Sequence, residues 1–280
     1  MRTLSAMREA YGLSMRAPRD GPDFVSRWTA VQGARIHHRA SRKAPPGALA
    51  VVLVHGLAVS HRYMMPFAAH LAGRYRVSAI DLPGFGLSDD PGSVLELPEL
   101  TDRLAEWLTV TGTGPAVLVG NSFGCQVAVD LAVRHPALVR GLVLAGPTMD
   151  ARGRTAPRQI LRALRDVRHE DPSQAPILLR DVIDAGPRRV ALTFRMALRD
   201  PVERKLPLID VPVLVTRGAL EPIIPQRWAE QVTGLLPRGE LAVVPSSPHN
   251  VNYAAAGRLA AVVTPFLDRL AARRPESRGA

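Results

Sequence analysis

The clearest pattern in the chain is a series of short apolar runs, each closed by a turn residue such as Gly, Pro or Asp. The runs are dense in Val, Leu and Ile and do not alternate with polar residues, which is typical of strands buried on both faces of a parallel sheet. They predict six strands, at Leu49–Val54, Arg76–Ile80, Ala116–Val119, Val139–Leu144, Val211–Val215 and Leu241–Val244.

Stretches of helical character separate these runs, at about 64–73, 98–111, 123–135, 226–236 and 254–273. Alternation of strand and helix predicts an α/β fold with an open, mostly parallel central sheet flanked by helices. In front of this series, Trp28–Val31 and Arg35–Arg39 are joined around Gly33 and predict an antiparallel hairpin.

One interval interrupts the alternation of strands and helices. About 60 residues, from Pro147 to Pro207, contain no strand-like run, which is too long for a simple connection. Helices are expected there at Arg158–Arg168, Pro176–Ala185 and Arg188–Leu198. We interpret 147–207 as a helical cap, or lid, inserted after Val139–Leu144, which is the sixth strand when the front hairpin is counted as two. The core would then comprise 24–146 and 208–272, with a basic N-terminal arm at 1–23 and a C-terminal tail at 273–280.

Composition narrows the class of protein. Of 280 residues, 46% are hydrophobic and 22% are charged, which indicates a folded domain with a sizeable core rather than a disordered chain. The single cysteine, Cys125, excludes an internal disulfide and a Cys-based zinc site. No apolar run approaches the ~20 residues of a transmembrane helix, and the N-terminus lacks the apolar core of a signal peptide. We expect a cytoplasmic protein that does not engage a membrane.

The strongest local motif is Gly120-Asn121-Ser122-Phe123-Gly124, between a predicted strand and a predicted helix. A serine at such a junction is typical of a nucleophile elbow, in which small residues let strand and helix pass closely. The hydroxyl of Ser122 would stand at the carboxyl edge of the sheet, near the positive end of the helix dipole. The alternative interpretation is an ordinary helix N-cap serine.

A serine hydroxyl is a weak nucleophile and needs an adjacent base. Among the eight histidines, His249 follows the last predicted strand and precedes the last helix, so its loop should open at the edge where Ser122 lies. We therefore predict His249 as the base.

Four segments together resemble the α/β-hydrolase superfamily, and most of all its small bacterial serine hydrolases with a helical cap. The resemblance covers most of 24–272. It rests on His55-Gly56-Leu57, on the D-x-P-G-x-G-x-S loop at Asp81–Ser88, on the elbow, and on Gly218–Pro225 with Pro248-His249. The chain order of serine, acid and histidine is also that of the family.

The resemblance implies further roles. The backbone N–H groups of Leu57 and Phe123 would form the oxyanion hole. The carboxylate that orients the histidine would be Glu221, where the family usually has Asp. Asp150 is the rival, since some members take their acid from that region, and Glu221 is favoured. Pro248 also departs from the Gly that is common before the histidine.

Serine at the elbow, rather than aspartate, speaks against the haloalkane dehalogenases and epoxide hydrolases of this fold. It favours a serine esterase or thioesterase that cleaves a carboxylic ester, thioester or related acyl bond through an acyl-enzyme. The same residues could also catalyse carbon–carbon bond cleavage, perhydrolysis or a cyclase or lyase step of a biosynthetic pathway. A non-catalytic binding protein is a further alternative. No metal-ligand spacing, Walker A motif or dinucleotide fingerprint occurs, so we expect neither cofactor nor metal. Candidate substrate-binding residues are Met64, Met149, Phe194 and Trp228.

The charge is strongly basic and unevenly placed. The chain has 36 basic and 25 acidic residues, and 34 of the basic ones are arginines. The net charge of +11 divides into +6 for 1–43, −3 for 44–150, +6 for 151–207 and +2 for 208–280. With no nucleic-acid-reading motif, we do not expect a nucleic-acid partner. The basic insert instead predicts a small-molecule substrate that is anionic or carrier-linked, such as a phosphopantetheine-bearing thioester. We expect a monomer or a homodimer.

Overall fold

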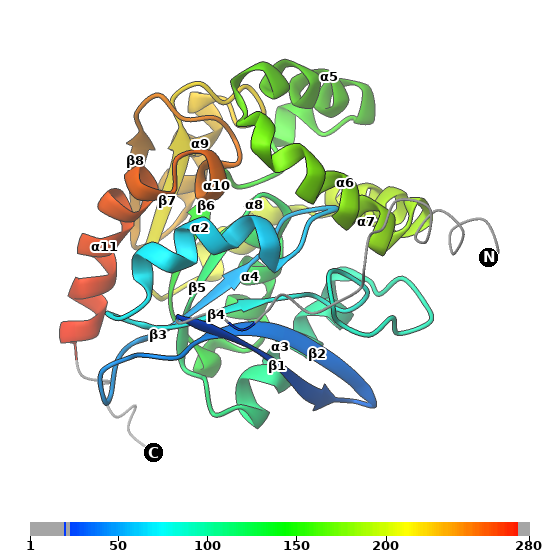
Figure 1. Cartoon of the computed structure of the whole chain (residues 1–280). Helices are drawn as coiled ribbons and strands as arrows, with labels where there is room; N and C mark the ends of the chain where they lie inside the picture. The colour runs from blue at the N-terminus through cyan, green and yellow to red at the C-terminus, as the bar shows by residue number, and fades with distance from the viewer. Residues whose placement is uncertain (1–19, 21–22, 274–280) are drawn as a thin grey trace.

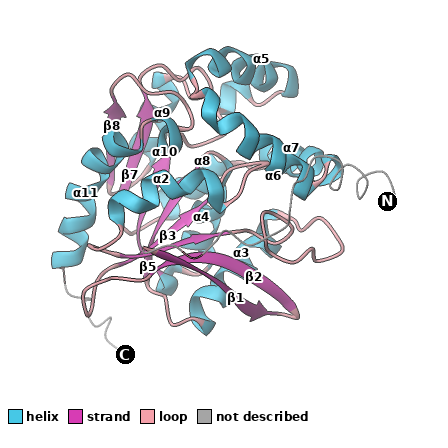
Figure 2. Cartoon of the chain, in the orientation of Figure 1, coloured by secondary structure: helices cyan, strands magenta, loops and turns pink. Residues whose placement is uncertain are grey.

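The protein folds around one central sheet with helices on both sides, in a computed structural model that describes residues 20 and 23–273 (Figures 1 and 2). Eight strands lie in the order β1-β2-β4-β3-β5-β6-β7-β8. β1 pairs with β2 and β2 with β4 in antiparallel fashion, and all other pairs are parallel. The strands are β1 Phe24–Val31, β2 Ala34–Ser41, β3 Ala50–Val54, β4 Arg76–Ile80, β5 Ala116–Asn121, β6 Val139–Ala145, β7 Val213–Gly218 and β8 Gly239–Val244.

Five longer helices form the two outer layers, and two apolar clusters show which face each one covers. α3, α4 and α9 pack on one face of the sheet, and α2 and α11 with the short α10 pack on the other. Their bounds are α2 His61–Leu71, α3 Leu97–Val110, α4 Phe123–Arg134, α9 Gln226–Leu235, α10 Val251–Ala254 and α11 Ala256–Ala272.

The central strand β3 shows why continuous apolar runs were needed. Val52 and Val54 join the cluster on one face, and Val51 and Leu53 join the cluster on the other. All four side chains are fully buried. Because successive side chains of a strand point to opposite faces, a sheet covered on both sides requires apolar residues at every position.

Between β6 and β7 the chain forms the helical insert, α5 Ala156–Asp166, α6 Ala175–Ala185, α7 Pro187–Arg199 and α8 Val202–Lys205. Short 3-10 turns join these helices, η2 Ala151–Gly153, η3 Val167–His169, η4 Pro172–Gln174 and η5 Leu206–Leu208; a further turn, η1 Pro136–Leu138, precedes β6. Figure 1 places α5 on the side toward which the arrowheads of β7 and β8 point. The Ser60 hydroxyl donates to Asp181 (2.8 Å) and Arg62 pairs with Asp184 (3.2 Å), which ties α6 to the start of α2.

The predicted fold class is confirmed: the sheet is mostly parallel, helices flank it, and the extra helices follow the sixth strand. Several boundaries differ by two to four residues: for example, the first strand begins at Phe24 rather than Trp28, and α2 begins at His61 rather than at residue 64. The strand expected from Val211 begins at Val213 and continues to Gly218, and the last helix is interrupted at Ala255. The proposed N-terminal arm and C-terminal tail lie almost entirely outside the described residues. Within the described residues, no helix combines the length and apolar character needed to span a bilayer.

Candidate active site

Ser122 occupies a sharp turn between β5 and α4. Its φ of 54° lies in the left-handed region, which a non-glycine residue rarely adopts. A Cβ on Gly120 would come within 2.5 Å of the Gly124 carbonyl oxygen, and one on Gly124 within 2.2 Å of the Val54 carbonyl oxygen. The two glycines therefore allow α4 to start directly against β3 and β5, which lifts the Ser122 side chain into a pocket above the sheet.

His249 and Glu221 meet at the same edge of the sheet, from the loops that follow β8 and β7. The Nδ1 atom of His249 lies 2.6 Å from Oε1 of Glu221, and the second carboxylate oxygen accepts the Gly218 N–H (3.1 Å). Burial lowers the pKa of His249, but the charge and hydrogen bond of Glu221, helped by Asp166 and Glu170, outweigh it and raise the pKa to about 9. The extra methylene of glutamate is thus accommodated without loss of the contact.

No hydrogen bond or ion pair among the described residues joins Asp150 to His249, so the structure brings Glu221, and not Asp150, to the imidazole. Its carboxylate is engaged by Arg162 (2.9 Å) and Arg227 (3.0 Å) and accepts the Arg152 N–H (3.1 Å). Burial raises the pKa of Asp150, but the guanidinium groups of Arg227 and Arg162 lower it by a larger amount, so the net shift is downward. The arginines join the start of the insert to α5 and α9, a contact that sequence order does not reveal.

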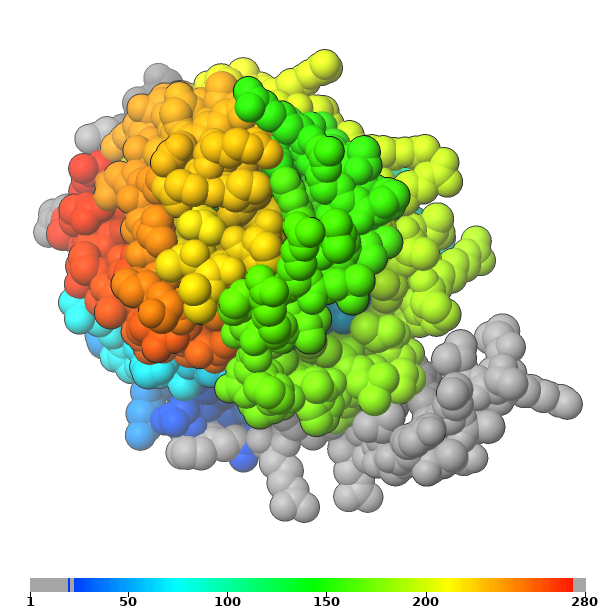
Figure 3. All heavy atoms as spheres, turned by 90° about the horizontal axis from the view of Figure 1, so that it is seen from above, coloured from blue at the N-terminus to red at the C-terminus, as the bar shows by residue number. Residues whose placement is uncertain are grey.

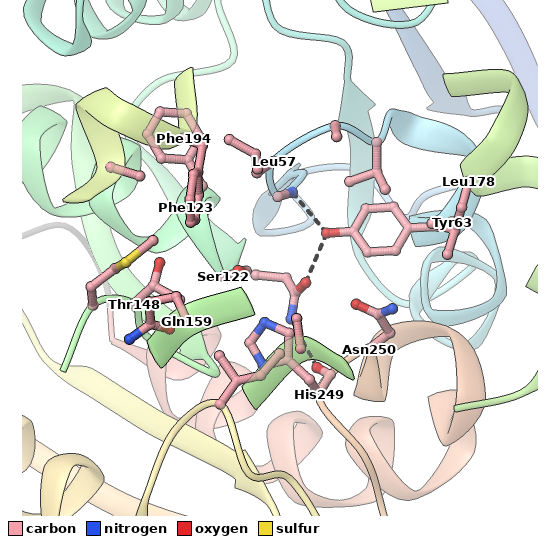
Figure 4. Close-up of a pocket in the computed structure, with 18 of the residues that line it drawn as sticks. Leu57, Tyr63, Ser122, Phe123, Thr148, Gln159, Leu178, Phe194, His249 and Asn250 are labelled. Carbon is pink, nitrogen blue, oxygen red and sulfur yellow. Dashed lines mark hydrogen bonds between the residues drawn. The ribbon is translucent and has the colours of Figure 1, made fainter. Parts of the chain in front are cut away.

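Ser122 and His249 line one pocket of about 310 Å³, and Figure 4 shows both side chains directed into it. Leu57, Phe123, Met149 and Phe194 also line it. Two other candidates do not line it. Met64 lies on α2 with its side chain buried against the sheet, and Trp228 is buried on the opposite face, where its Nε1–H donates to the Pro147 carbonyl (2.8 Å).

Leu57 and Phe123, whose backbone N–H groups were assigned to the oxyanion hole, line this pocket together with Ser122. Phe123 is the first residue of α4, where an N–H has no acceptor within the helix. Neither the Phe123 nor the Leu57 N–H donates a hydrogen bond to another described residue. Both are therefore available to an oxyanion.

Sequence reasoning missed a hydrogen-bond chain that joins the three loops of the site. The Tyr63 hydroxyl accepts the Gly56 N–H (2.7 Å) and donates to Oδ1 of Asn121 (2.8 Å), contacts drawn in Figure 4. The Asn121 amide in turn donates to the carbonyl of His249 (3.3 Å). The elbow motif includes Asn121 as its second residue, but the motif does not reveal its hydrogen-bond partners, because these come from three other segments of the chain.

The insert also contacts the histidine loop. Glu170 accepts the backbone N–H of Asn250 (2.7 Å), and Gln174 accepts the side-chain amide of Asn250 (3.0 Å). Asp166 is buried nearby with one carboxyl oxygen lacking a hydrogen-bond partner. Burial, and then the neighbouring Glu170, raise the pKa of Asp166 to about 8. Two acidic groups of the insert therefore lie close to the imidazole without contacting Ser122.

One cluster has a composition that suits a metal ion: His37, His61 and Asp81 place potential ligand atoms within 4.8 Å of one another. The carboxylate of Asp81 is already hydrogen-bonded to both imidazoles. Asp81 accepts from Nδ1 of His37 (2.8 Å) and of His61 (2.8 Å), and also from the Leu87 N–H (3.0 Å). Burial raises the pKa of Asp81, but the two imidazoles hold it well below its usual range. The cluster anchors the Asp81–Ser88 loop.

The fold and this site define an α/β hydrolase, and comparison with known proteins agrees. The model of the alpha/beta hydrolase family matches residues 51–262, so the chain belongs to this family. It is 25% identical to 2-(acetamidomethylene)succinate hydrolase of Mesorhizobium japonicum over 91% of this chain and 100% of that one. It is 27% identical to a pimeloyl-[acyl-carrier protein] methyl ester esterase of Edwardsiella ictaluri, over 71% of this chain and 85% of the relative.

Solved structures show the same fold. A bacterial membrane phospholipase A superposes with a TM-score of 0.77 at 23% identity, covering 97% of this chain and 92% of that chain. An esterase from Thermogutta terrifontis superposes with a TM-score of 0.72 at 24% identity, covering 88% and 98%. The predicted membership in the α/β-hydrolase superfamily is confirmed.

Proposed function

We propose that the protein is a cofactor-independent serine hydrolase that cleaves a carboxylic ester or thioester through an acyl-enzyme. The observation that carries this proposal is the shared pocket, which is lined both by Ser122 at its strained turn and by His249, itself bound to Glu221. The relatives that are named as hydrolases and esterases support the same class of reaction.

In the proposed mechanism, neutral His249 removes the proton of the Ser122 hydroxyl as its oxygen attacks the carbonyl carbon. Glu221 stabilises the imidazolium that results. The N–H groups of Leu57 and Phe123 bind the oxyanion of the tetrahedral intermediate, and each such donor is worth about 3–4 kcal/mol in the transition state. The imidazolium then protonates the leaving group. Water activated by His249 releases the acyl group and regenerates Ser122.

The pocket lining favours an apolar group as the part of the substrate that enters. Its walls include the apolar side chains of Val59, Met149, Leu178, Phe194 and Ile223, and no Lys or Arg is among the lining residues that the structure describes. We propose that the insert, 147–207, acts as a cap that supplies part of this wall, since Gln159, Ala163, Leu178, Val182, Phe194 and Ala197 come from it.

An anionic or carrier-bearing portion would then remain outside, near the basic insert, which carries 13 basic and 7 acidic residues over 151–207. The relative named for a carrier-protein ester fits this arrangement. For a substrate of this kind, kcat/KM should fall steeply as salt rises from 20 to 300 mM, whereas a neutral ester with the same acyl group should change little. Equal salt dependence of the two would contradict the anionic preference.

A fluorophosphonate probe tests the serine mechanism directly. The folded protein should form one covalent adduct on Ser122, and S122A should form none while retaining its circular-dichroism spectrum and melting temperature. The wild-type protein should then hydrolyse neutral aryl esters and thioesters from a test panel, and S122A should hydrolyse none of them. Folded wild-type protein that forms no adduct would overturn the proposal, and an adduct without turnover would favour a non-hydrolytic reaction.

A further inference from the structure

Helix α5 presents its large aliphatic side chains to solvent rather than to the core, unlike an ordinary amphipathic surface helix. Gln159 and Asp166 are buried. Leu164 and Val167, by contrast, are 67% and 66% exposed, and Ile160 and Leu161 are also exposed. The spacing of 160, 164 and 167 places three of these side chains on one face. Within the described residues, nothing covers this face.

The exposed face continues to the mouth of the pocket. Ala163 of α5 and Val182 of α6 both line the pocket and are themselves exposed, and Leu179 of α6 is exposed nearby along the same helix. Figure 3 shows a hollow between the green helices of the insert, seen from above. We call this set the rim surface; it comprises Ile160, Leu161, Leu164, Val167, Leu179 and Val182, six of the twelve large hydrophobic side chains exposed in the described part of the chain.

The exposed charged side chains of α5 and η3 are positive, while the exposed Asp171 follows η3. Arg158, Arg165 and Arg168 are exposed, and none of them forms an ion pair with an acidic group among the described residues. The fourth arginine of this segment, Arg162, is engaged by Asp150, and the one acidic residue of α5, Asp166, is buried. The exposed part of α5 and η3 therefore offers apolar side chains flanked only by cationic ones.

This combination selects among the possible occupants. A second copy of the chain would bring the same arginines against one another. An acidic protein surface would pair with the arginines but leave several large aliphatic side chains without an apolar counterpart. An anionic lipid surface satisfies both features, because aliphatic side chains enter the acyl boundary while arginines stay among the headgroups.

We propose, contrary to the expectation from the sequence that the protein does not engage a membrane, that the rim surface docks the protein onto an anionic lipid surface, with the mouth of the pocket turned toward it. Asp181, buried against Ser60, and Asp184, paired with Arg62, fix α6 to the core, so the surface is presented by an anchored element. Docking by itself does not depend on the proposed hydrolysis, and it can be measured in the S122A protein.

The test is co-sedimentation of full-length S122A with vesicles of phosphatidylglycerol and phosphatidylcholine (1:1) and with vesicles of phosphatidylcholine alone. We expect binding to the anionic vesicles that weakens with salt and is about tenfold or more weaker to neutral ones. R165Q and R168Q should each weaken binding about fivefold, as expected for loss of roughly 1 kcal/mol per arginine near an anionic leaflet. I160D/L164D should abolish binding.

V110D and L208D provide matched controls, since these two aliphatic residues are also exposed, 59% and 62%, but lie outside the rim surface. They should bind vesicles like the parent, and all variants should keep the parent melting temperature within a few degrees. Two outcomes would overturn the proposal. One is that the parent protein fails to bind anionic vesicles at 150 mM salt, or that I160D/L164D binds them as well as the parent does. The other is a dimer in sedimentation velocity that I160D/L164D dissociates, which would assign the surface to a second copy.

Discussion

The hydroxyl of Tyr63 donates to Oδ1 of Asn121 at 2.8 Å while it accepts the N–H of Gly56 at 2.7 Å. Through this one oxygen, the loop that carries Leu57 is joined to the residue that precedes Ser122. All three residues are buried. The relative position of the proposed oxyanion donor and the nucleophile is thus set by a side chain of α2 that takes no part in the chemistry.

Replacing Tyr63 by Phe should leave the Gly56 N–H and the side-chain Oδ1 of Asn121 buried without this partner. We expect a loss of about 1–3 kcal/mol in the free energy of unfolding and a fall in kcat of at least about tenfold, because the donors would be less well placed. Urea unfolding and steady-state kinetics measure the two effects. Y253F is the control, since the Tyr253 hydroxyl hydrogen-bonds to the Ser173 hydroxyl at an exposed position and to no other side chain in the described part of the chain; equal losses in both variants would argue against the positioning role.

Glu221 and Asp150 should respond in opposite ways to loss of charge. E221Q should lower kcat by about 10³–10⁴-fold with little change in stability, because the amide cannot stabilise the imidazolium. D150N should leave kcat within a few-fold but cost about 3 kcal/mol of stability, because two arginines lose a buried partner. Kinetics and denaturant unfolding on both variants decide the matter. Loss of activity in D150N alone would reverse the assignment.

The pH dependence of kcat/KM should report His249, whose pKa is about 9. The base must be neutral, so kcat/KM should rise about tenfold per unit below that pKa and level off above it. Glu170 helps to raise this pKa, so E170Q should move the rising limb to lower pH. The exposed Glu230 on α9 gives the matched control, E230Q. A limb that stays in place in E170Q would show that Glu170 acts only by holding Asn250.

Asp166 should make the folded state less stable as pH rises. Its pKa is about 8 in the folded protein and about 3.9 in an unfolded chain, so between these values the native state binds the proton more tightly. Stability should therefore decline from about pH 4 to pH 8 through this group. D166N mimics the protonated acid, so it should match wild type at pH 5 and be about 1–3 kcal/mol more stable at pH 9.

Thermal and urea unfolding at the two pH values provide the test for Asp166. The exposed Asp210 supplies a control, D210N, which should show no such difference between pH 5 and pH 9. If D166N were destabilised equally at both pH values, the buried carboxyl would instead be a structural hydrogen-bonding group.

Much of the fold was determined by local sequence. A run such as Ala50–Val54, which has no polar position, requires burial on both faces. Glycine is required at 120 and 124 because α4 starts directly against β3 and β5. The strands, the position of the helical insert, and the placement of Ser122 and His249 at one edge of the sheet could therefore be predicted from the apolar pattern, the elbow motif and the order of the elements. The interruption at Ala255 could not, because nothing in the apolar pattern of 254–273 marks it.

Tertiary structure decided which groups pair. Whether Glu221 or Asp150 orients His249 depended on Arg162 and Arg227, which occupy Asp150 from segments distant in sequence. The roles of Tyr63 and Asn121 likewise rest on contacts between separate loops. The spacing in α5 identified a helix with one apolar face but not the direction of that face, because periodicity is unchanged when a helix turns about its axis. Only packing against the rest of the protein shows that Gln159 and Asp166 face inward and that the aliphatic side chains face outward.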